Sequence, residues 1–139
     1  MAEPPHAAHR QRPLSPFTTI YHWPVTMATS ITHRVTGVGL AAGTLLLAWW
    51  LVAVASGPSA FNQFIDLAST PLGQVILFGF TWALAYHLVN GIRHLVWDFG
   101  YGFGKTAARN ASVLVIAGSV VLAAGFFALA YAGHGGFYQ

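Results

Sequence analysis

Between Val35 and Ile92 the chain carries a single formally charged side chain, Asp66. A water-soluble domain spreads charged residues over its surface, so a stretch this long with one charge cannot cover itself in water. Charged residues make up 6% of the 139 residues and hydrophobic residues 55%, which agrees with the same conclusion. The sequence therefore predicts that a lipid bilayer surrounds most of the chain.

Three long apolar stretches follow one another, at residues 35–55, 67–92 and 110–131. A transmembrane helix needs roughly 20 mostly apolar residues, and each stretch meets that need. Gly57-Pro58 marks the end of the first helix, and Pro71 suits the first turn of the second. We expect one all-α membrane domain over residues 1–139, with helices at about 26–55, 68–98 and 110–132 and a loop from Ser56 to Thr70.

The short connecting segments differ in positive charge. Arg10 and Arg12 precede the first helix, and Lys105 and Arg109 lie between the second and third, whereas residues 56–70 and 132–139 contain no lysine or arginine. The positive-inside rule therefore predicts a cytoplasmic N-terminal segment, residues 1–24, and a periplasmic C-terminus. The net charge of +3 shows no nucleic-acid footprint, and the absence of cysteine excludes thiolate-bound metal within the chain.

The second helix contains the segment His87-Leu-Val-Asn-Gly-Ile-Arg-His-Leu-Val-Trp-Asp98. His87 lies about 16 Å from Asp98 along a helix, near the middle of the bilayer, where an ionisable residue is a functional candidate. Small residues share its face at four-residue spacing: Gly79, Ala83 and Gly91. This strip would let a flat porphyrin approach His87. The alternative is a core histidine bonded to a backbone carbonyl or to a hydroxyl of a neighbouring helix.

A low-spin haem needs a second axial ligand. Counting along the helices places His33 and His94 nearer the cytoplasmic surface than His87, so we expect the second ligand to come from another chain. His94 is seven residues beyond His87, where it can meet a haem propionate. For His94 and Arg93 the alternative is snorkelling at the membrane interface.

The first helix carries Ser30 and Arg34 four residues apart, on one face. Arg34 lies about 12 Å past Thr26, inside the apolar zone, and can reach back over Ser30 toward the headgroups. Together they offer a hydroxyl and a guanidinium to a carbonyl oxygen, a carboxylate or a phosphate. The alternative is an arginine that snorkels to lipid phosphate, with Ser30 bonded back to its own helix.

Two motifs make the chain recognisable. The first is Arg12-Pro-Leu-Ser-Pro16 followed by Ser30-Ile-Thr-His33-Arg34-Val-Thr-Gly37. The second is His87-x-x-x-Gly91-Ile-Arg-His94-Leu-x-Trp97-Asp98-x-Gly100. In order and spacing they resemble the cytochrome b membrane-anchor subunit of succinate dehydrogenase, respiratory Complex II.

The resemblance implies that His87 is an axial ligand of haem b and that Ser30 and Arg34 line a ubiquinone pocket. It implies that His33, Arg34 and His94 lie near the haem propionates. The implied partners are a second small anchor subunit that supplies the other axial histidine, an iron–sulfur subunit and a flavoprotein subunit. Electrons from succinate would pass through them to ubiquinone, so the chain itself would carry no catalytic residue.

The implied location is the bacterial inner membrane, in preference to the mitochondrial inner membrane. One alternative within this class is the anchor of a quinol:fumarate reductase. An alternative from another class is a non-redox three-helix membrane subunit, such as a proton-conducting subunit that uses His87. A reducible b-type spectrum is expected only of the anchor subunits.

Overall fold

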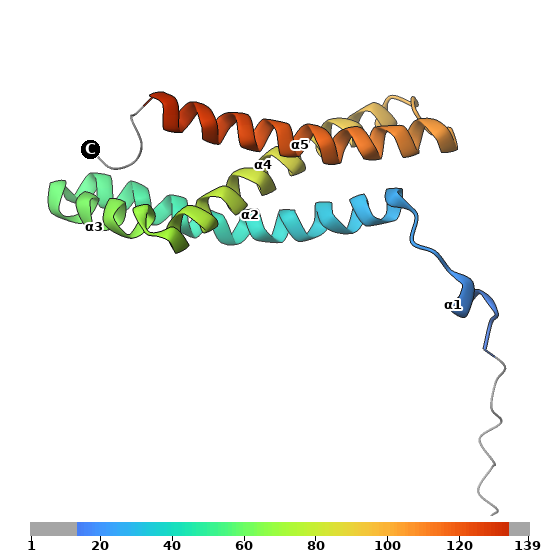
Figure 1. The fold of residues 1–139 in the computed structure, drawn as a ribbon, viewed down its shortest axis with the longest axis horizontal. Helices are drawn as coiled ribbons and strands as arrows, with labels where there is room; N and C mark the ends of the chain where they lie inside the picture. The colour runs from blue at the N-terminus through green and yellow to red at the C-terminus, as the bar shows by residue number, and fades with distance from the viewer. Residues whose placement is uncertain (1–13, 134–139) are drawn as a thin grey trace, which may run out of the picture.

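The chain folds entirely into helices in the computed structural model, which describes residues 14–133 (Figure 1). A short helix α1, Phe17–Ile20, precedes α2, Val25–Ser56. Then follow α3, Pro58–Ser69; α4, Pro71–Asp98; and α5, Lys105–Gly133. The described residues therefore form three long helices and two short ones.

The long helices α2, α4 and α5 are each apolar and long enough to cross a membrane. In the most apolar 18 residues of each helix, the share of buried residues is 6% for α2, 17% for α4 and 17% for α5. Large aliphatic side chains such as Leu45, Val121 and Leu129 are instead exposed on the outside of the bundle. This inside-out arrangement suits a lipid solvent, and it confirms the predicted all-helical fold with three candidate spans.

The helix α3 was not predicted, because the sequence indicated a loop from Ser56 to Thr70. Gly57, with a φ of 102°, allows the sharp turn after α2, and Pro58 starts the new helix. The Phe64 side chain is buried against Trp49, with ring centroids 4.9 Å apart. Phe61, Phe64, Ile65 and Ala68 recur at the spacing of one helical face, which is the signal that reveals α3.

Two helix ends differ from the expected bounds: α5 begins before residue 110, and α4 begins at Pro71 instead of about residue 68. The structure starts α5 at Lys105, whereas the apolar stretch pointed to residue 110. The first turns of α5, which include Lys105 and Arg109, precede the apolar stretch and are helical outside the predicted membrane span. At the start of α4, the Thr70 hydroxyl accepts a hydrogen bond of 3.1 Å from the Gly73 amide and caps the helix.

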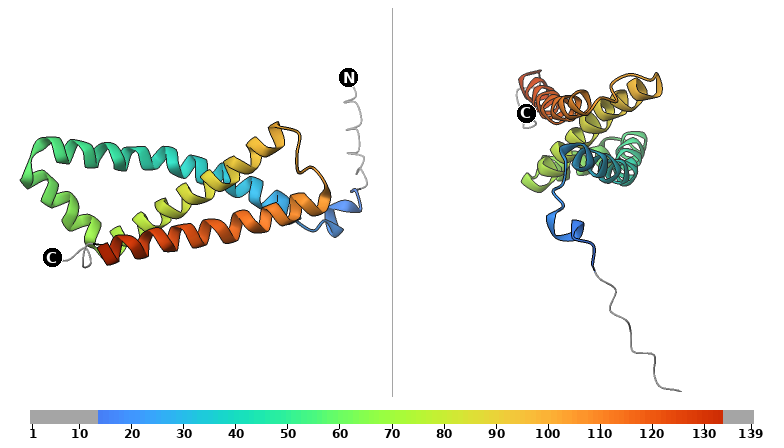
Figure 2. Two further views of the ribbon diagram at one scale, coloured as in Figure 1. Left: turned by 90° about the horizontal axis from the view of Figure 1, so that it is seen from above. Right: turned by 90° about the vertical axis from the view of Figure 1, so that its right-hand side faces the viewer.

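Small and polar residues fill the interior of the bundle. On α5 the buried residues are Ser112, Val115, Ser119 and Ala123, which let α4 and α5 lie close together. Figure 2 shows that α4 crosses α2 at an angle. A side chain at Gly43 would collide with Phe80 of α4, so Gly43 serves close helix packing, whereas Gly39 has open space beside it.

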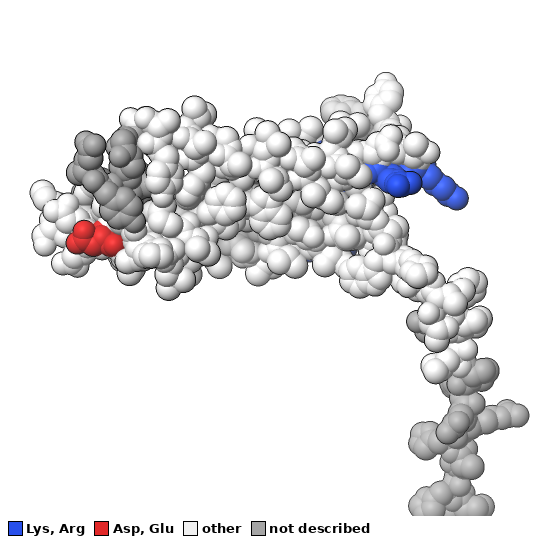
Figure 3. All heavy atoms as spheres, in the orientation of Figure 1, with Lys and Arg blue, Asp and Glu red and all other residues white. Residues whose placement is uncertain are grey.

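Positive charge gathers at one end of the bundle. Figure 3 shows the visible lysine and arginine atoms at the end where α5 begins, and the visible acidic atoms at the opposite end, near α3. Lys105 and Arg109 are exposed there. Arg10 and Arg12, on which the predicted orientation also depends, lie outside the described residues.

Candidate functional site

Three histidine rings lie together where α2 and α4 face each other. The ring centroids of His33 and His87 are 3.9 Å apart, with planes inclined by 16°, and those of His33 and His94 are 5.3 Å apart. The rings stack instead of converging on one point. Within residues 14–133 no group of three or more side chains could hold a metal ion. The cluster is therefore not built to bind a bare metal ion through several side chains.

The position of His33 bears on the search for a second axial ligand. Counting residues places His33 nearer the cytoplasmic surface than His87, and the structure stacks the two rings 3.9 Å apart. Figure 2 shows that α2 and α4 cross, which brings these two side chains together. Stacked rings cannot bind one iron from opposite faces of a porphyrin. His33 is therefore not the second axial ligand in this arrangement, and a ligand from another chain stays a prediction.

The Thr36 hydroxyl of α2 lies close to the His87 ring. The Thr36 side chain is 4% exposed, and its hydroxyl donates to the carbonyl oxygen of His33 at 3.0 Å. The same oxygen lies 3.4 Å from Nδ1 of His87. If the hydroxyl keeps its hydrogen on the His33 carbonyl, Thr36 accepts from His87 and the ring proton lies on Nδ1. Nε2 of His87 is then the unprotonated nitrogen, the form that binds a metal.

The contact with Thr36 is also the one expected of a core histidine bonded to a neighbouring helix. The glycines on the His87 face of α4 bear on the other possibility, a bound porphyrin. A Cβ added at Gly79 or Gly91 would meet nothing within 4 Å, so packing inside this chain does not require glycine there. A Cβ at Gly37 would come within 3.1 Å of the His87 ring. The open glycines leave room for a flat group or a partner helix beside His87.

A groove continues this strip along α2 and α4. It has a volume of about 330 Å³ and is lined by Gly39, Ala42, Gly43, Leu46, Ile76, Gly79, Phe80 and Ala83. Two of these residues, Gly79 and Ala83, belong to the strip predicted from the sequence. The groove thus begins one helical turn from His87 and has almost no polar side chains.

Ser30 and Arg34 lie at the edge of the bundle. Ser30 is half-buried and Arg34 is exposed. Within the described part of the chain, the Ser30 hydroxyl makes no hydrogen bond, so it is not bonded back to its own helix as the alternative required. Both side chains remain available to a group outside this chain.

A buried polar network was missed from the sequence. The Arg93 side chain is 7% exposed, and its Nη1 donates to Thr29 Oγ1 and to Asn90 Oδ1, both at 3.0 Å. Tyr86 donates its hydroxyl to the Thr29 carbonyl at 2.9 Å. The snorkelling alternative for Arg93 is therefore wrong. Polar residues at positions 86, 90 and 93 share one helix face, and that spacing was the available signal.

Three buried nitrogens at this end of the bundle have no hydrogen-bond partner: His33 Nε2, Asn90 Nδ2 and Arg93 Nε. Buried nitrogens without partners are costly, so they point to an acceptor outside this chain. A carboxylate is an acceptor of the right kind. The His33 nitrogen therefore fits the predicted propionate region, and the open strip beside His87 fits the ring.

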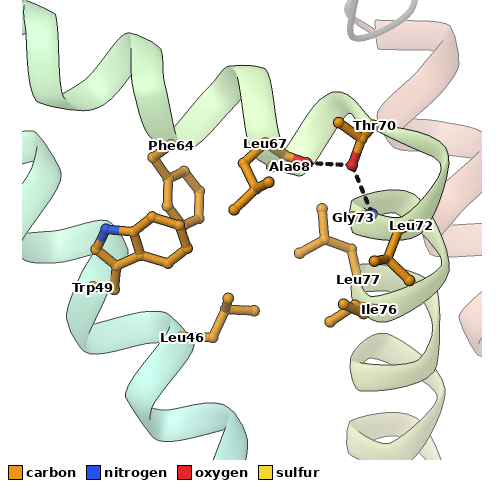
Figure 4. A pocket seen from close by; sticks show the side chains of 10 residues that line it. All are labelled: Leu46, Trp49, Phe64, Leu67, Ala68, Thr70, Leu72, Gly73, Ile76 and Leu77. Atoms are coloured by element: carbon orange, nitrogen blue, oxygen red, sulfur yellow. Dashed lines mark hydrogen bonds between the residues drawn. The ribbon is translucent and has the colours of Figure 1, made fainter.

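The opposite end of the bundle holds a hollow of a different kind. It lies between α2, α3 and α4 and has a volume of about 190 Å³ (Figure 4). Leu46, Trp49, Phe64 and Leu77 are among its lining side chains, and none of the ten lining residues is ionisable. This hollow offers shape and apolar surface but no acid, base or ligand.

The fold and the site define a class of protein: a multi-pass helical membrane subunit with histidine, arginine and hydroxyl side chains gathered inside one half of its bundle. The family model described as succinate dehydrogenase/fumarate reductase transmembrane subunit matches residues 8–126. The chain belongs to the succinate dehydrogenase cytochrome b membrane subunits of Complex II.

Relatives occur in bacteria and in mitochondria. The succinate dehydrogenase cytochrome b556 subunit of Paracoccus denitrificans is 48% identical over 112 residues, which cover 81% of this chain and 86% of the relative. The corresponding subunit of Rickettsia prowazekii is 39% identical over 114 residues, covering 82% and 89%. The human mitochondrial cytochrome b560 subunit is 37% identical over 123 residues, covering 85% and 71%.

Proposed function

We propose that this chain binds haem b through His87 and contributes Ser30 and Arg34 to a ubiquinone-reduction site. The observation that carries the proposal is the setting of His87. This histidine shares a helix face with the open glycines Gly79 and Gly91, and an Nδ1–H donated to Thr36 would leave Nε2 for iron. The relatives named cytochrome b556 support the same cofactor.

Each remaining side chain of the site has a distinct task in this proposal. His33, Arg34 and His94 bind the haem propionates, for which the unpartnered His33 Nε2 is a suitable donor. Ser30 and Arg34 hold a quinone carbonyl and stabilise the negative charge that develops on it during reduction. Haem, when bound here, supplies a one-electron carrier. The chain contributes positioning and charge, and no catalytic residue of its own.

The proposed partners follow the same scheme. A second small anchor subunit supplies the other axial histidine, since His33 is stacked on His87 and cannot do so. A flavoprotein subunit and an iron–sulfur subunit deliver electrons from succinate. The direction toward ubiquinone is part of the proposal, because the matching family also contains fumarate reductase subunits. Family membership favours either of these over a non-redox membrane subunit.

The haem assignment is tested by replacing His87. His87→Leu should remove or shift the low-spin b-type absorbance of the purified complex, because an axial ligand is lost. Gly91→Leu should also disturb the spectrum by holding the ring away from the helix. His22→Gln, outside the spanning helices, is the control. Unchanged spectra in both site variants would rule out His87 as the ligand.

We further propose that the chain is a single domain in the bacterial inner membrane, with residues 1–24 in the cytoplasm and the C-terminus in the periplasm. The end of the bundle that carries Lys105 and Arg109 then faces the cytoplasm. A reporter that is active only in the periplasm should work when fused after Gln139 and stay silent at Lys105. The opposite pattern would reverse the orientation.

A further inference from the structure

Arg93 is a buried cation without an acidic partner. The acidic side chains in the described part of the chain are Asp66 and Asp98, and both are exposed. The Arg93 guanidinium instead bonds Thr29 and Asn90, and its central carbon lies 4.1 Å from the centre of the Trp97 ring. Burying a charge is costly unless its bonds are well made. A guanidinium this deep therefore marks a place where the helices are held in a fixed geometry.

The residue that Arg93 holds is Thr29 of α2. Thr29 Oγ1 donates to the Thr26 carbonyl at 2.9 Å, so its lone pairs are free to accept from Arg93. Tyr86, also on α4, bonds the Thr29 carbonyl from the same helix face. Thr29 itself is 1% exposed and lies 3.4 Å from the Ser112 hydroxyl of α5. One residue of α2 is thus held by two side chains of α4.

The two hydrogen bonds from Arg93 and Tyr86 to Thr29 set the rotation of α2 about its own axis. Successive residues of a helix point about 100° apart, so a helix fixed at Thr29 has its other faces fixed as well. Thr36, seven residues on, points inward with Thr29. Ser30 and Arg34 follow Thr29 by one and five positions, and both are turned to the edge of the bundle.

We propose that Arg93 is a positioning residue that fixes the rotation of α2 and thereby presents Ser30 and Arg34 to the quinone. The proposal rests on the function proposed above. It differs from a role in general stability, because Arg93 and Tyr86 both bond one residue, which is the sequence neighbour of Ser30. Both bonds come from one nitrogen, Nη1, so a lysine, whose ammonium has three donors, can keep the charge and bond the same acceptors.

The experiment compares four variants in the assembled complex: Arg93→Gln, Arg93→Lys, Thr29→Val and the exposed control Arg109→Gln. Haem absorbance and succinate oxidation by an artificial acceptor verify assembly. In Arg93→Gln the KM for ubiquinone should rise about tenfold, more than kcat falls, because a charged hydrogen bond that orients the site is lost. Arg93→Lys should restore the KM to within about threefold of the parent value, and Arg109→Gln should leave it unchanged.

The link to Thr29 is tested by a double variant. Thr29→Val should raise the KM in the same direction, and Arg93→Gln combined with Thr29→Val should be no worse than the more affected single variant. If the double variant instead multiplies the KM increases of the two single variants, Arg93 does not act through Thr29. If Arg93→Gln does not assemble, Thr29→Val and Tyr86→Phe each remove one hydrogen bond between α4 and Thr29 while keeping the charge of Arg93. Normal quinone kinetics in both variants would overturn the proposal.

Arg34→Ala separates this inference from the proposed function. If Arg34→Ala impairs quinone reduction and an assembled Arg93→Gln complex has a normal KM, the positioning role is wrong and the quinone site stands. If Arg34→Ala also behaves normally, the quinone site itself is wrong. A KM that Arg93→Lys fails to restore would overturn the claim that the bond to Thr29 is what matters.

Discussion

The two halves of the bundle differ in what fills the space between the helices. In the half where α5 begins, Arg93, Tyr86 and Thr29 join α2 to α4 through hydrogen bonds of 2.9–3.0 Å. In the half near α3, the same two helices enclose an apolar hollow with the Phe64–Trp49 pair at its side (Figure 4). Both halves must be stable in lipid, but among the described residues the buried arginine and the clustered histidines lie in the first.

The difference shows which side chains are buried at a cost that stability in the membrane does not account for. Lipid accepts apolar surface at no cost, so an apolar hollow requires no particular function. A buried arginine and three buried nitrogens without partners are expensive in the same medium. The buried polar groups that the membrane does not explain therefore lie in the half that contains Thr29 and His87.

The largest kinetic effect is expected from Arg34. Arg34→Ala removes a charged hydrogen bond to the quinone, which costs about 1.5–3 kcal/mol. At about 1.4 kcal/mol per factor of ten, quinone reduction should slow roughly tenfold or more. Ser30→Ala should have a smaller or similar effect. Steady-state rates with ubiquinone measure this, and succinate oxidation by an artificial acceptor should persist.

Assembly must be confirmed first in these variants, because Arg34 is also proposed to bind a haem propionate. An unchanged haem spectrum provides that control. An assembled Arg34→Ala complex that reduces ubiquinone at the parent rate would return Arg34 to the alternative of snorkelling to lipid phosphate. The polar half would then lose its proposed role in quinone chemistry.

A smaller effect is expected from Thr36. Thr36→Val removes the acceptor at His87 Nδ1 while keeping the shape of the side chain, whereas Thr36→Ser keeps the hydroxyl. Loss of such an outer partner typically weakens binding of the metal by about 10–100-fold. Because haem is held by several contacts, we expect Thr36→Val to shift its midpoint potential and speed its loss, with little change in quinone KM. Equal behaviour of the valine and serine variants would show that Thr36 does not set the His87 tautomer.

The sequence predicted the three spans because a bilayer imposes a length of apolar residues, and that constraint acts within each helix alone. It did not predict how the helices meet. The stacking of His33 on His87 depends on the crossing of α2 and α4, and the burial of Arg93 depends on acceptors 64 residues away at Thr29. The helix α3 was missed for another reason: its apolar face is short, and Gly57-Pro58 was interpreted only as a stop.

The smallest effect on function is expected at the apolar end. Phe64→Ala leaves a cavity and removes an edge-to-face pair with Trp49 worth about 0.5–1.5 kcal/mol beyond its burial, so the complex should lose activity at a lower temperature in detergent. The KM and kcat for ubiquinone should change less than about twofold, because the reacting end of the bundle is held by its own hydrogen bonds. Phe126→Ala, on the exposed surface of α5, is the control for loss of an aromatic ring. A large rise in quinone KM for Phe64→Ala alone would mean that the apolar hollow takes part in quinone binding, and the two halves would not be separate in function.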